Sequence, residues 1–264
     1  MLGVWRVKET DGGSETQVKM KAGGDSAAEW VRTALGFAPD EIQARVLDTA
    51  AKRGVLNCTR QWGKSTVTAA KAVREAWSRK GSLTIVVSPT ARQSSELVRK
   101  ASQLASRLGV PDRGDGDNEI SLAFPNGSRI IGLPGTEATV RGFSAVSLLL
   151  VDEASRVSDQ LYLAVRPMLA VSRGAVWLMS TPYGKRGFFW DTWDGGGPAW
   201  ERIRVTAAEC PRIPKEFLKE EMATMGDQWF RQEYCCEFVD SVSGVFDRDL
   251  VNGAISDEFV PLKL

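Results

Sequence analysis

The sequence predicts an α/β fold, in which a mostly parallel sheet is covered by helices on both faces. Short apolar runs typical of buried strands alternate along the chain with segments of helical period, which is the pattern of parallel strands joined by helices. One of these runs, residues 55–58, passes through a polar turn into Gly63-Lys64-Ser65-Thr66 at the start of the next helix. This strand, turn and helix predict a phosphate-binding loop.

Length and composition limit the class of protein. The 264 residues, 43% of them hydrophobic, can form one large domain with a small appended subdomain. The 34 basic and 33 acidic residues nearly cancel, so any DNA contact must be a local patch. The longest apolar run, near residues 148–151, is too short to cross a membrane, and the first residues are too charged for a secretory signal. We therefore expect a soluble intracellular protein with no membrane partner.

The sequence contains no histidine and four cysteines without metal-ligand spacing, Cys58, Cys210, Cys235 and Cys236. A zinc site is therefore not expected, and reduced structural thiols are the simpler interpretation. Without histidine, any general base must be a carboxylate, a lysine, a tyrosine or a cysteine.

The region before the loop predicts an arm followed by two helices. The chain is polar and rich in glycine up to residue 24, so we expect residues 1–24 to form a flexible arm. A first helix, over 26–35, can be capped by Ser26. A second begins at Pro39 and ends near Gly54, with an apolar face formed by Ile42, Val46 and Leu47.

Gln43, in the second of these helices, has two interpretations. Its amide offers the donor and the acceptor needed to pair with the N6 amine and N7 of adenine, and Phe37 can stack on the ring. Alternatively, Gln43 is a solvated helix residue and Phe37 is a core aromatic, which is what we would expect for an isolated glutamine. The residues alone leave both interpretations open.

The loop at residues 58–66 has the groups that bind a nucleoside triphosphate. Gly63 lets the backbone approach the phosphate oxygens, Lys64 can reach the β- and γ-phosphates, and the Ser65 hydroxyl is placed to ligate Mg²⁺. One position departs from the pattern G-x-x-x-x-G-K-[ST], because Cys58 stands where the first glycine is expected. The remaining nucleotide contacts that we expect from the loop are Arg60, Gln61, Trp62 and Thr66.

After the loop the alternation of helix and strand continues. We expect helices over 66–79, 91–108, 158–169, 215–225 and 228–239, and strands over 82–88, 147–152, 174–180 and 200–206. Two further strands, over 119–124 and 128–133, flank a Pro-Asn-Gly turn and predict a hairpin.

The strand at 147–152 ends in two adjacent carboxylates. Asp152 lies at the edge where parallel sheets bind ligands, so it can hold Mg²⁺ through water. Glu153 can polarise the water that attacks the γ-phosphate, a task that falls to an acid in a chain without histidine. Such a pair is often only a polar strand end, but downstream of a phosphate loop the catalytic interpretation is favoured.

The strand at 174–180 ends in Ser180, Thr181 and Pro182. The two hydroxyls can sense whether the γ-phosphate is present. A strand that leaves the core through a Thr-Pro turn is the alternative, and the residues alone support it equally.

Together these segments resemble the N-terminal ATPase half of phage terminase large subunits, the motors that package double-stranded DNA into a procapsid. The resemblance covers residues 25–247 and rests on Phe37 with Gln43, Arg60 to Thr66, Ser88-Pro89-Thr90, Leu149 to Ala154, and Ser180 to Pro182. It implies a P-loop NTPase of the RecA-like, ASCE class. It also implies a core over 25–200, a lid subdomain over 201–247, and over 248–264 the start of a linker to an absent nuclease domain, so we expect a truncated chain or an isolated motor domain.

The resemblance also implies roles for individual residues. It assigns adenine reading to Gln43 and phosphate binding to Lys64 and Ser65. It assigns metal binding to Ser65 and Asp152, and water activation to Glu153. Coupling of hydrolysis to movement is assigned to Ser180, Thr181 and Pro182. Arg141 looks like the family's arginine finger, which a neighbouring subunit inserts to stabilise transition-state charge. The alternatives are that Arg141 is an ordinary loop arginine and that Arg60 performs this task.

The implied substrate is ATP, and the implied cofactor is Mg²⁺. The implied partners are double-stranded DNA, the portal protein and the small terminase subunit. The resemblance further implies a homo-oligomeric ring, a pentamer in the family, that works on the procapsid in the host cytoplasm.

Two other classes remain open. A superfamily 2 helicase fragment has similar adenine, hydrolysis and coupling motifs, but a helicase needs a second RecA-like domain, and too few residues come after Pro182 to form one. A nucleotide-binding clamp with degraded catalysis is the third possibility. The intact Lys64, Asp152 and Glu153 argue against it.

Overall fold

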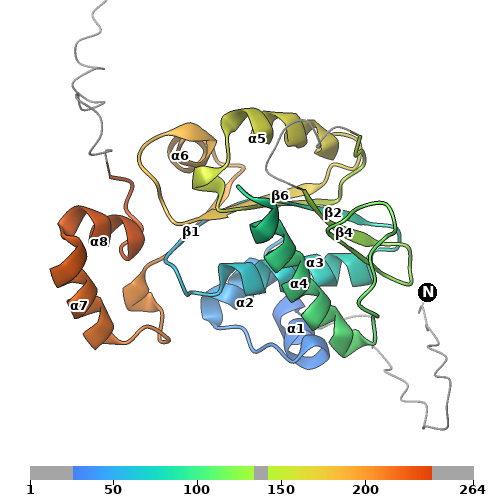
Figure 1. The fold of residues 1–264 in the computed structure, drawn as a ribbon, viewed down its shortest axis with the longest axis horizontal. Coiled ribbons are helices and arrows are strands. Elements are labelled where there is room, and N and C mark those ends of the chain that lie inside the picture. Colours follow the sequence, from blue (N-terminus) through green and yellow to red (C-terminus); the bar gives the residue numbers. More distant parts are fainter. Residues whose placement is uncertain (1–25, 134–141, 240–264) are drawn as a thin grey trace, which may run out of the picture.

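The computed structural model describes residues 26–133 and 142–239, and its centre is a sheet of seven strands (Figure 1). The strand order is β3-β4-β2-β5-β6-β1-β7. All neighbouring strands are parallel except β3 and β4, which form the predicted hairpin. The strands are β1 Arg53–Cys58, β2 Leu83–Val87, β3 Ser121–Ala123, β4 Arg129–Leu133, β5 Leu148–Asp152, β6 Ala175–Ser180 and β7 Glu201–Val205. The predicted α/β class is confirmed.

Helices cover both faces of this sheet (Figure 1). One face carries α1 Ala27–Leu35, α2 Glu41–Asp48, α3 Lys64–Ser78 and α4 Ala91–Ala105. The other carries α5 Asp159–Val165 and α6 Gly187–Gly195, whereas α7 Lys215–Met225 and α8 Asp227–Glu233 lie to one side. Short 3-10 turns are η1 Ser106–Leu108, η3 Ala154–Arg156, η4 Arg166–Leu169 and η5 Ala207–Glu209.

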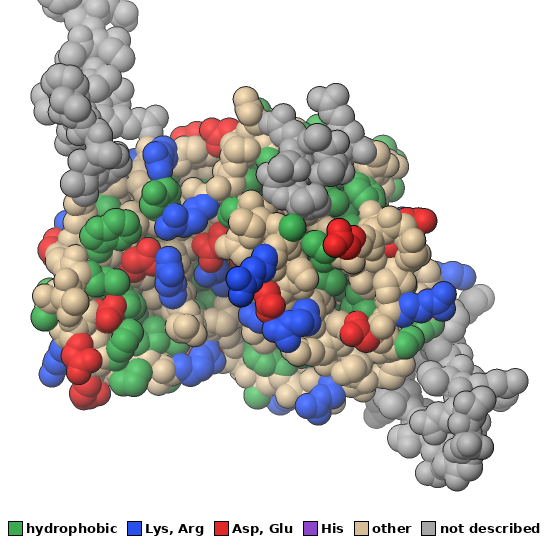
Figure 2. Space-filling view, viewed as in Figure 1, with side chains coloured by type: hydrophobic (Ala, Val, Ile, Leu, Met, Phe, Trp, Pro, Cys, Tyr) green, Lys and Arg blue, Asp and Glu red, His purple; other side chains and the backbone are tan. Residues whose placement is uncertain are grey.

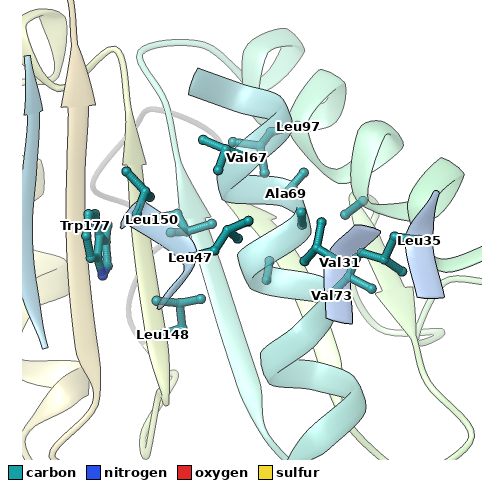
Figure 3. Packing of buried hydrophobic residues seen from close by; sticks show 14 of the residues in the cluster. Val31, Leu35, Leu47, Val67, Ala69, Val73, Leu97, Leu148, Leu150 and Trp177 are labelled. Atoms are coloured by element: carbon teal, nitrogen blue, oxygen red, sulfur yellow. The ribbon is translucent and has the colours of Figure 1, made fainter. Parts of the chain in front are cut away.

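The strands are apolar on both sides because both faces are buried. Successive residues point to opposite faces, so Val55 joins the core beneath α5 and α6 while Leu56 joins the core beneath α1 to α4. Figure 3 shows side chains of α1 and α3 packed in this second core with Leu148, Leu150 and Trp177 of the sheet. This packing fixes the strands, and therefore their carboxyl ends, relative to α3.

Gly54 allows the largest of these side chains to fit. A Cβ atom at Gly54 would lie 2.4 Å from the ring of Trp177, which is fully buried. Since Gly54 pairs directly with Trp177 between β1 and β6, the missing side chain lets the indole lie across β1. The two strands that carry the phosphate loop and Ser180 are thus locked together near their middles.

Two helices end earlier than the sequence predicted. Helix α2 stops at Asp48 rather than near Gly54, because Thr49 turns into an extended conformation and its hydroxyl accepts the amide hydrogen of Ala51. Helix α8 stops at Glu233 rather than at residue 239. The chain then turns through Cys236, which has a positive φ of 56°. The other predicted elements are present with small shifts at their ends, and α6 is an additional helix that the sequence pattern did not indicate.

The segment after α8 returns to the sheet. The Thr59 hydroxyl donates to the carbonyl of Glu233 at 3.0 Å, and the Asn57 amide donates to the carbonyl of Cys236 at 2.8 Å. Strand β7 belongs to the main sheet, so the sheet extends past residue 200. The division into core and lid stays a prediction, and the arm at 1–24 and the linker at 248–264 lie outside the described residues. Among the helices that are described, none is long and apolar enough to cross a membrane.

Candidate nucleotide-binding site

The predicted site residues lie on strands that are neighbours in the sheet. Strand β6 pairs in parallel with β1 on one side and with β5 on the other. The carboxyl ends of the three strands therefore meet at one edge, which is where parallel sheets bind ligands. They carry the phosphate loop, Asp152 with Glu153, and Ser180 with Thr181 and Pro182.

The loop tolerates Cys58 because its unusual backbone lies elsewhere. Cys58 is the last residue of β1 and is fully buried in the core. Positive φ angles occur instead at Gln61, 66°, and at Gly63, 97°. Glycine is thus needed at the second glycine position of the pattern and not at the first.

Helix α3 presents its free N-terminus to this edge. Gly63 is its N-cap, and no side chain of the described residues caps it. The amides of Thr66 and Val67 bond back to the Gly63 carbonyl. Because the first amides of a helix have no partner within the helix, and because the helix dipole is positive at this end, the N-terminus of α3 can accept a phosphate.

Lys64 and Glu153 form an ion pair across the site. The ammonium nitrogen of Lys64 lies 2.8 Å from Oε1 of Glu153, and the two side chains are only 11% and 23% exposed. Burial opposes the charged form of Lys64, but the acidic groups around it, Cys58, Glu153 and Asp152, raise its pKa above the ordinary value. The nearby Cys58 thiol stays neutral, because burial raises its pKa to about 12. The base candidate and the phosphate-binding lysine are therefore already in contact.

Glu153 is held by the residues predicted to couple hydrolysis to movement. Its backbone is left-handed, with a φ of 49°, and this conformation turns the chain sharply after β5. The conformation costs of order 1 kcal/mol of strain. The Ser180 hydroxyl lies 3.4 Å from Oε2 of Glu153 and 2.7 Å from the hydroxyl of Ser155. Thr181 donates to the carbonyl of Cys58 at 3.1 Å, which links this group to the phosphate loop, and Pro182 beside it is buried.

Asp152 has the properties of a metal ligand. Its side chain is 6% exposed, and its Oδ1 atom has no hydrogen-bond partner within the part of the chain that the structure describes. Burial raises its pKa to about 6. The described residues contain no group of three or more acidic, cysteine or histidine side chains arranged to hold a metal ion by themselves. One carboxylate and the Ser65 hydroxyl nevertheless fit Mg²⁺, which proteins hold through one or two carboxylates together with the phosphates of the substrate.

Gln43 is buried, so the interpretation of a solvated helix residue is wrong. Its side chain is 1% exposed. Its Oε1 accepts the amide hydrogen of Asp40 at 3.0 Å, and its Nε2 donates to the carbonyl of Trp62 at 3.0 Å. Phe37 is half-buried against the core beneath α1 to α4. The amide of Gln43 thus supports the phosphate loop, and its reading of adenine stays a prediction.

Sequence reasoning missed two loop contacts that come from distant segments. Arg212 donates through Nη2 to the carbonyl of Trp62 and lies 3.4 Å from a carboxylate oxygen of Asp40. Glu233 holds Nε of Arg60 at 2.7 Å. No local motif can reveal these partners, because they are 150 and 173 residues away in the sequence. Trp62 is buried and Gln61 is exposed, whereas Arg141 lies outside the described residues.

Comparisons with known proteins point to one family. A family model described as the terminase large subunit, T4likevirus-type, N-terminal domain matches residues 55–252. The terminase large subunit of Thermus virus P23-45 is 27% identical over 247 residues, covering 80% of this chain and 51% of that protein. This chain spans about half the length of the curated relatives it matches.

Solved structures show the same fold. The ATPase domain of the large terminase of Thermus phage P74-26 superposes with a TM-score of 0.70 at 24% identity, covering 82% of this chain and 100% of that domain. The large terminase of another thermophilic bacteriophage, solved in complex with ADP, gives a TM-score of 0.61 at 11% identity, covering 72% of this chain and 48% of that one.

The raised pKa of Asp152 predicts a pH-dependent stability difference. Its ordinary pKa of 3.8 rises to about 6 in the fold, so the stability that the protonated form contributes is complete below pH 3.8 and is lost as the pH rises through 6. Asp152→Asn has no such loss. When the pH is raised from 5 to 7.5, in EDTA and without added nucleotide, we expect the parent to lose about 1 kcal/mol of unfolding free energy relative to the variant.

Urea denaturation at the two pH values measures this difference. Asp117→Asn, an exposed aspartate in the loop after η1, is the matched control and should behave like the parent. An Asp152→Asn variant that keeps a constant offset from the parent at both pH values would contradict the buried, unpaired state of this carboxyl.

Proposed function

Because the chain belongs to the terminase large subunit family, through its N-terminal domain, we propose that it is an ATPase motor domain that hydrolyses ATP to move double-stranded DNA into a procapsid. The observation that carries the proposal is the ion pair of Lys64 with Glu153 beside the unpartnered oxygen of Asp152, at the N-terminus of α3. Family membership also favours this function over the helicase alternative.

ATP binding exchanges the partner of Lys64. The β- and γ-phosphates sit at the N-terminus of α3, where the amides and the Lys64 ammonium meet their charge. Since Lys64 pairs with Glu153 in the structure, its movement toward the phosphates would release one oxygen of that carboxylate. Glu153 then becomes free to accept a hydrogen bond from water.

Hydrolysis depends on this exchange. The oxygen of the water attacks the γ-phosphorus, the bond to the bridging oxygen of the β-phosphate breaks, and ADP leaves with the bonding electron pair. Glu153 orients the water and accepts its proton, which the solvent finally takes up with inorganic phosphate as the second product. Ser65 and Asp152 would hold Mg²⁺, which when bound neutralises charge on the phosphates.

The further partners are inferred from family membership. We propose that the domain works as a homo-oligomeric ring, a pentamer, on the portal of a procapsid in the host cytoplasm, together with the small terminase subunit. An arginine supplied by the neighbour, Arg141, completes each site. Arg60 is the alternative, and its ion pair with Glu233 would have to open before it could reach the phosphates.

Glu153→Gln tests the hydrolysis proposal. The amide keeps the shape of the side chain but cannot take up a proton, so kcat should fall by about 10²- to 10⁴-fold while ATP affinity stays near that of the parent. Steady-state turnover and fluorescent-nucleotide binding measure the two quantities. Lys64→Ala is the matched control and should lose ATP affinity. Normal turnover in Glu153→Gln would remove Glu153 from the mechanism.

Gln43→Ala tests adenine reading. If the amide pairs with the base, the ratio of ATP affinity to GTP affinity should fall toward one, and competition binding measures this ratio. Gln43 also supports the carbonyl of Trp62, so both affinities can weaken for a structural reason. An unchanged ratio, with or without such a parallel loss, would leave Gln43 only as a support of the loop.

Mixing two inactive variants tests the arginine finger. Glu153→Ala keeps its arginine but cannot activate water, whereas Arg141→Ala keeps its carboxylate but lacks the finger. If Arg141 acts on the neighbouring site, some interfaces in the mixture combine one intact element from each variant, and turnover should reappear. Fingers contribute about 10³ to 10⁵ in rate, so even a minority of such interfaces is measurable. No recovery where parent subunits associate would place the essential arginine in the same subunit, with Arg60 the first candidate.

A further inference from the structure

Two arginines enclose one tyrosine beside the site, and the proposed hydrolysis uses none of the three. The guanidinium carbon of Arg156 lies 4.1 Å from the ring centroid of Tyr183, and that of Arg186 lies 4.8 Å from it. Both arginines are exposed and the tyrosine is half-buried. We call these three residues the Arg–Tyr–Arg cluster.

The charge of the cluster is not compensated. Among the described residues, neither Arg156 nor Arg186 has a carboxylate within ion-pair distance, whereas Arg60, Arg129 and Arg231 each have one. Other exposed arginines, such as Arg92 and Arg107, also lack a carboxylate at this distance among the described residues, so what distinguishes Arg156 and Arg186 is that both lie over one aromatic ring. Lys and Arg side chains are also unevenly placed on the face shown in Figure 2, where they gather between α8 and α4. Local positive charge of this kind is the feature that binds polyanions.

The stacking on Tyr183 prepares the arginines for phosphate. A guanidinium that lies over an aromatic ring uses its face, so its N–H groups remain available at its edge. Arginine binds phosphate through these edge groups, often with two parallel hydrogen bonds. Because the ring already restricts both side chains, less conformational entropy is lost when they bind.

The position of the cluster connects it to catalysis. Arg156 is the last residue of η3, the turn directly after Glu153, and Tyr183 comes directly after Pro182. The two segments are joined by Ser155, whose hydroxyl contacts that of Ser180 at 2.7 Å and donates to the Thr181 carbonyl at 2.9 Å. A ligand that bridges Arg156 and Arg186 would therefore act on the hydrogen bonds around the catalytic carboxylate.

We propose that the Arg–Tyr–Arg cluster binds the phosphate backbone of double-stranded DNA, without regard to sequence, and passes the presence of DNA to Glu153 through Ser155 and Ser180. The inference rests on the proposed function, which supplies DNA as the partner. It assigns a surface for that partner, which family membership alone does not.

The test is the salt dependence of DNA binding by the whole chain. Binding to a fluorescent 30-base-pair duplex is measured by anisotropy between 50 and 200 mM KCl for the parent and for Arg156→Gln/Arg186→Gln. Each lost phosphate contact lowers the slope of log K against log salt by about 0.9, so the double variant should lose about 1.8 in slope and on the order of tenfold or more in affinity. Arg156→Gln alone should lose about half of that slope.

The matched control removes the same charge elsewhere. Arg32→Gln/Arg45→Gln deletes two exposed arginines that pair with Glu29 and Glu201, and it should bind DNA like the parent. Tyr183→Phe should bind normally, because the ring is kept. Turnover without DNA and the urea midpoint should be unchanged in Arg156→Gln/Arg186→Gln, which shows that the fold and the site are intact, whereas stimulation of turnover by DNA should be lost.

The possible outcomes separate this inference from the proposed function. A parent that binds DNA while the cluster variant and the control behave alike would overturn the cluster as the DNA contact and leave the motor proposal standing. The two arginine changes can also be added to both variants of the mixing test. If they abolish the recovery of turnover there but leave DNA binding normal, the cluster lies at a subunit contact, and this result also overturns the proposal. A parent that hydrolyses ATP but does not bind duplex DNA at 50 mM salt would contradict both DNA as the partner and the cluster as its binding surface.

Discussion

The ion pair between Lys64 and Glu153 is the interaction on which the arrangement of the site depends. Each charge is mostly removed from water, and a buried charge is tolerated only when it has a partner. The pair therefore compensates both charges, and it occupies the carboxylate that we propose as the base. In the proposed mechanism the same contact breaks when ATP binds. The proposed site therefore exchanges one compensated charge for another, and Glu153 can act as a base once phosphate has replaced it as the partner of Lys64.

This pairing requires a particular sheet order. Lys64 comes after β1 and Glu153 comes after β5, and the two strands are held apart by β6. The spacing between them is maintained by the close packing of Trp177 across Gly54 and by the buried, apolar faces of all three strands. Ser180, the last residue of β6, and Thr181 after it contact the two flanking strand ends, Ser180 at Glu153 and Thr181 at the carbonyl of Cys58. Strand β6 thus sets the separation of β1 from β5, and its end provides the hydroxyls of the site.

Local patterns predicted the features that are local. The phosphate loop, the carboxylates after β5 and the hydroxyls after β6 can be predicted from strands of continuous apolar residues and from short motifs, because each strand end is defined by its own neighbours. The predicted ends of α2 and α8 were wrong, since the residues at these helix ends bond partners that no local pattern contains: Thr49 contacts Glu201, and Glu233 contacts Arg60. The burial of Gln43 had the same cause. Its amide bonds the backbone of Trp62, a contact that exists only once the loop lies against α2.

The hydrogen bonds around Ser155 admit two arrangements but not both at once, because a serine hydroxyl has a single proton. If Ser155 donates to the Thr181 carbonyl at 2.9 Å, Ser180 must donate to Ser155, and Glu153 receives nothing. If Ser155 instead donates to Ser180, the Ser180 proton is available to Glu153, which lies 3.4 Å away, and the Thr181 carbonyl loses its donor. The shorter distance favours the first arrangement, in which Glu153 has Lys64 as its partner.

In the proposed mechanism, movement of Lys64 toward a nucleotide removes that partner and makes the second arrangement more favourable, so the hydrogen bonds of Ser155 would change when the site is occupied. Arg156 directly follows Ser155 in the chain, and Tyr183 lies two residues beyond Thr181. A phosphate backbone bound by the Arg–Tyr–Arg cluster would therefore affect the hydrogen bonds of the same two hydroxyls, those of Ser155 and Ser180. In the proposed motor, nucleotide and DNA would then act on one proton position, which is a physical route between hydrolysis and movement.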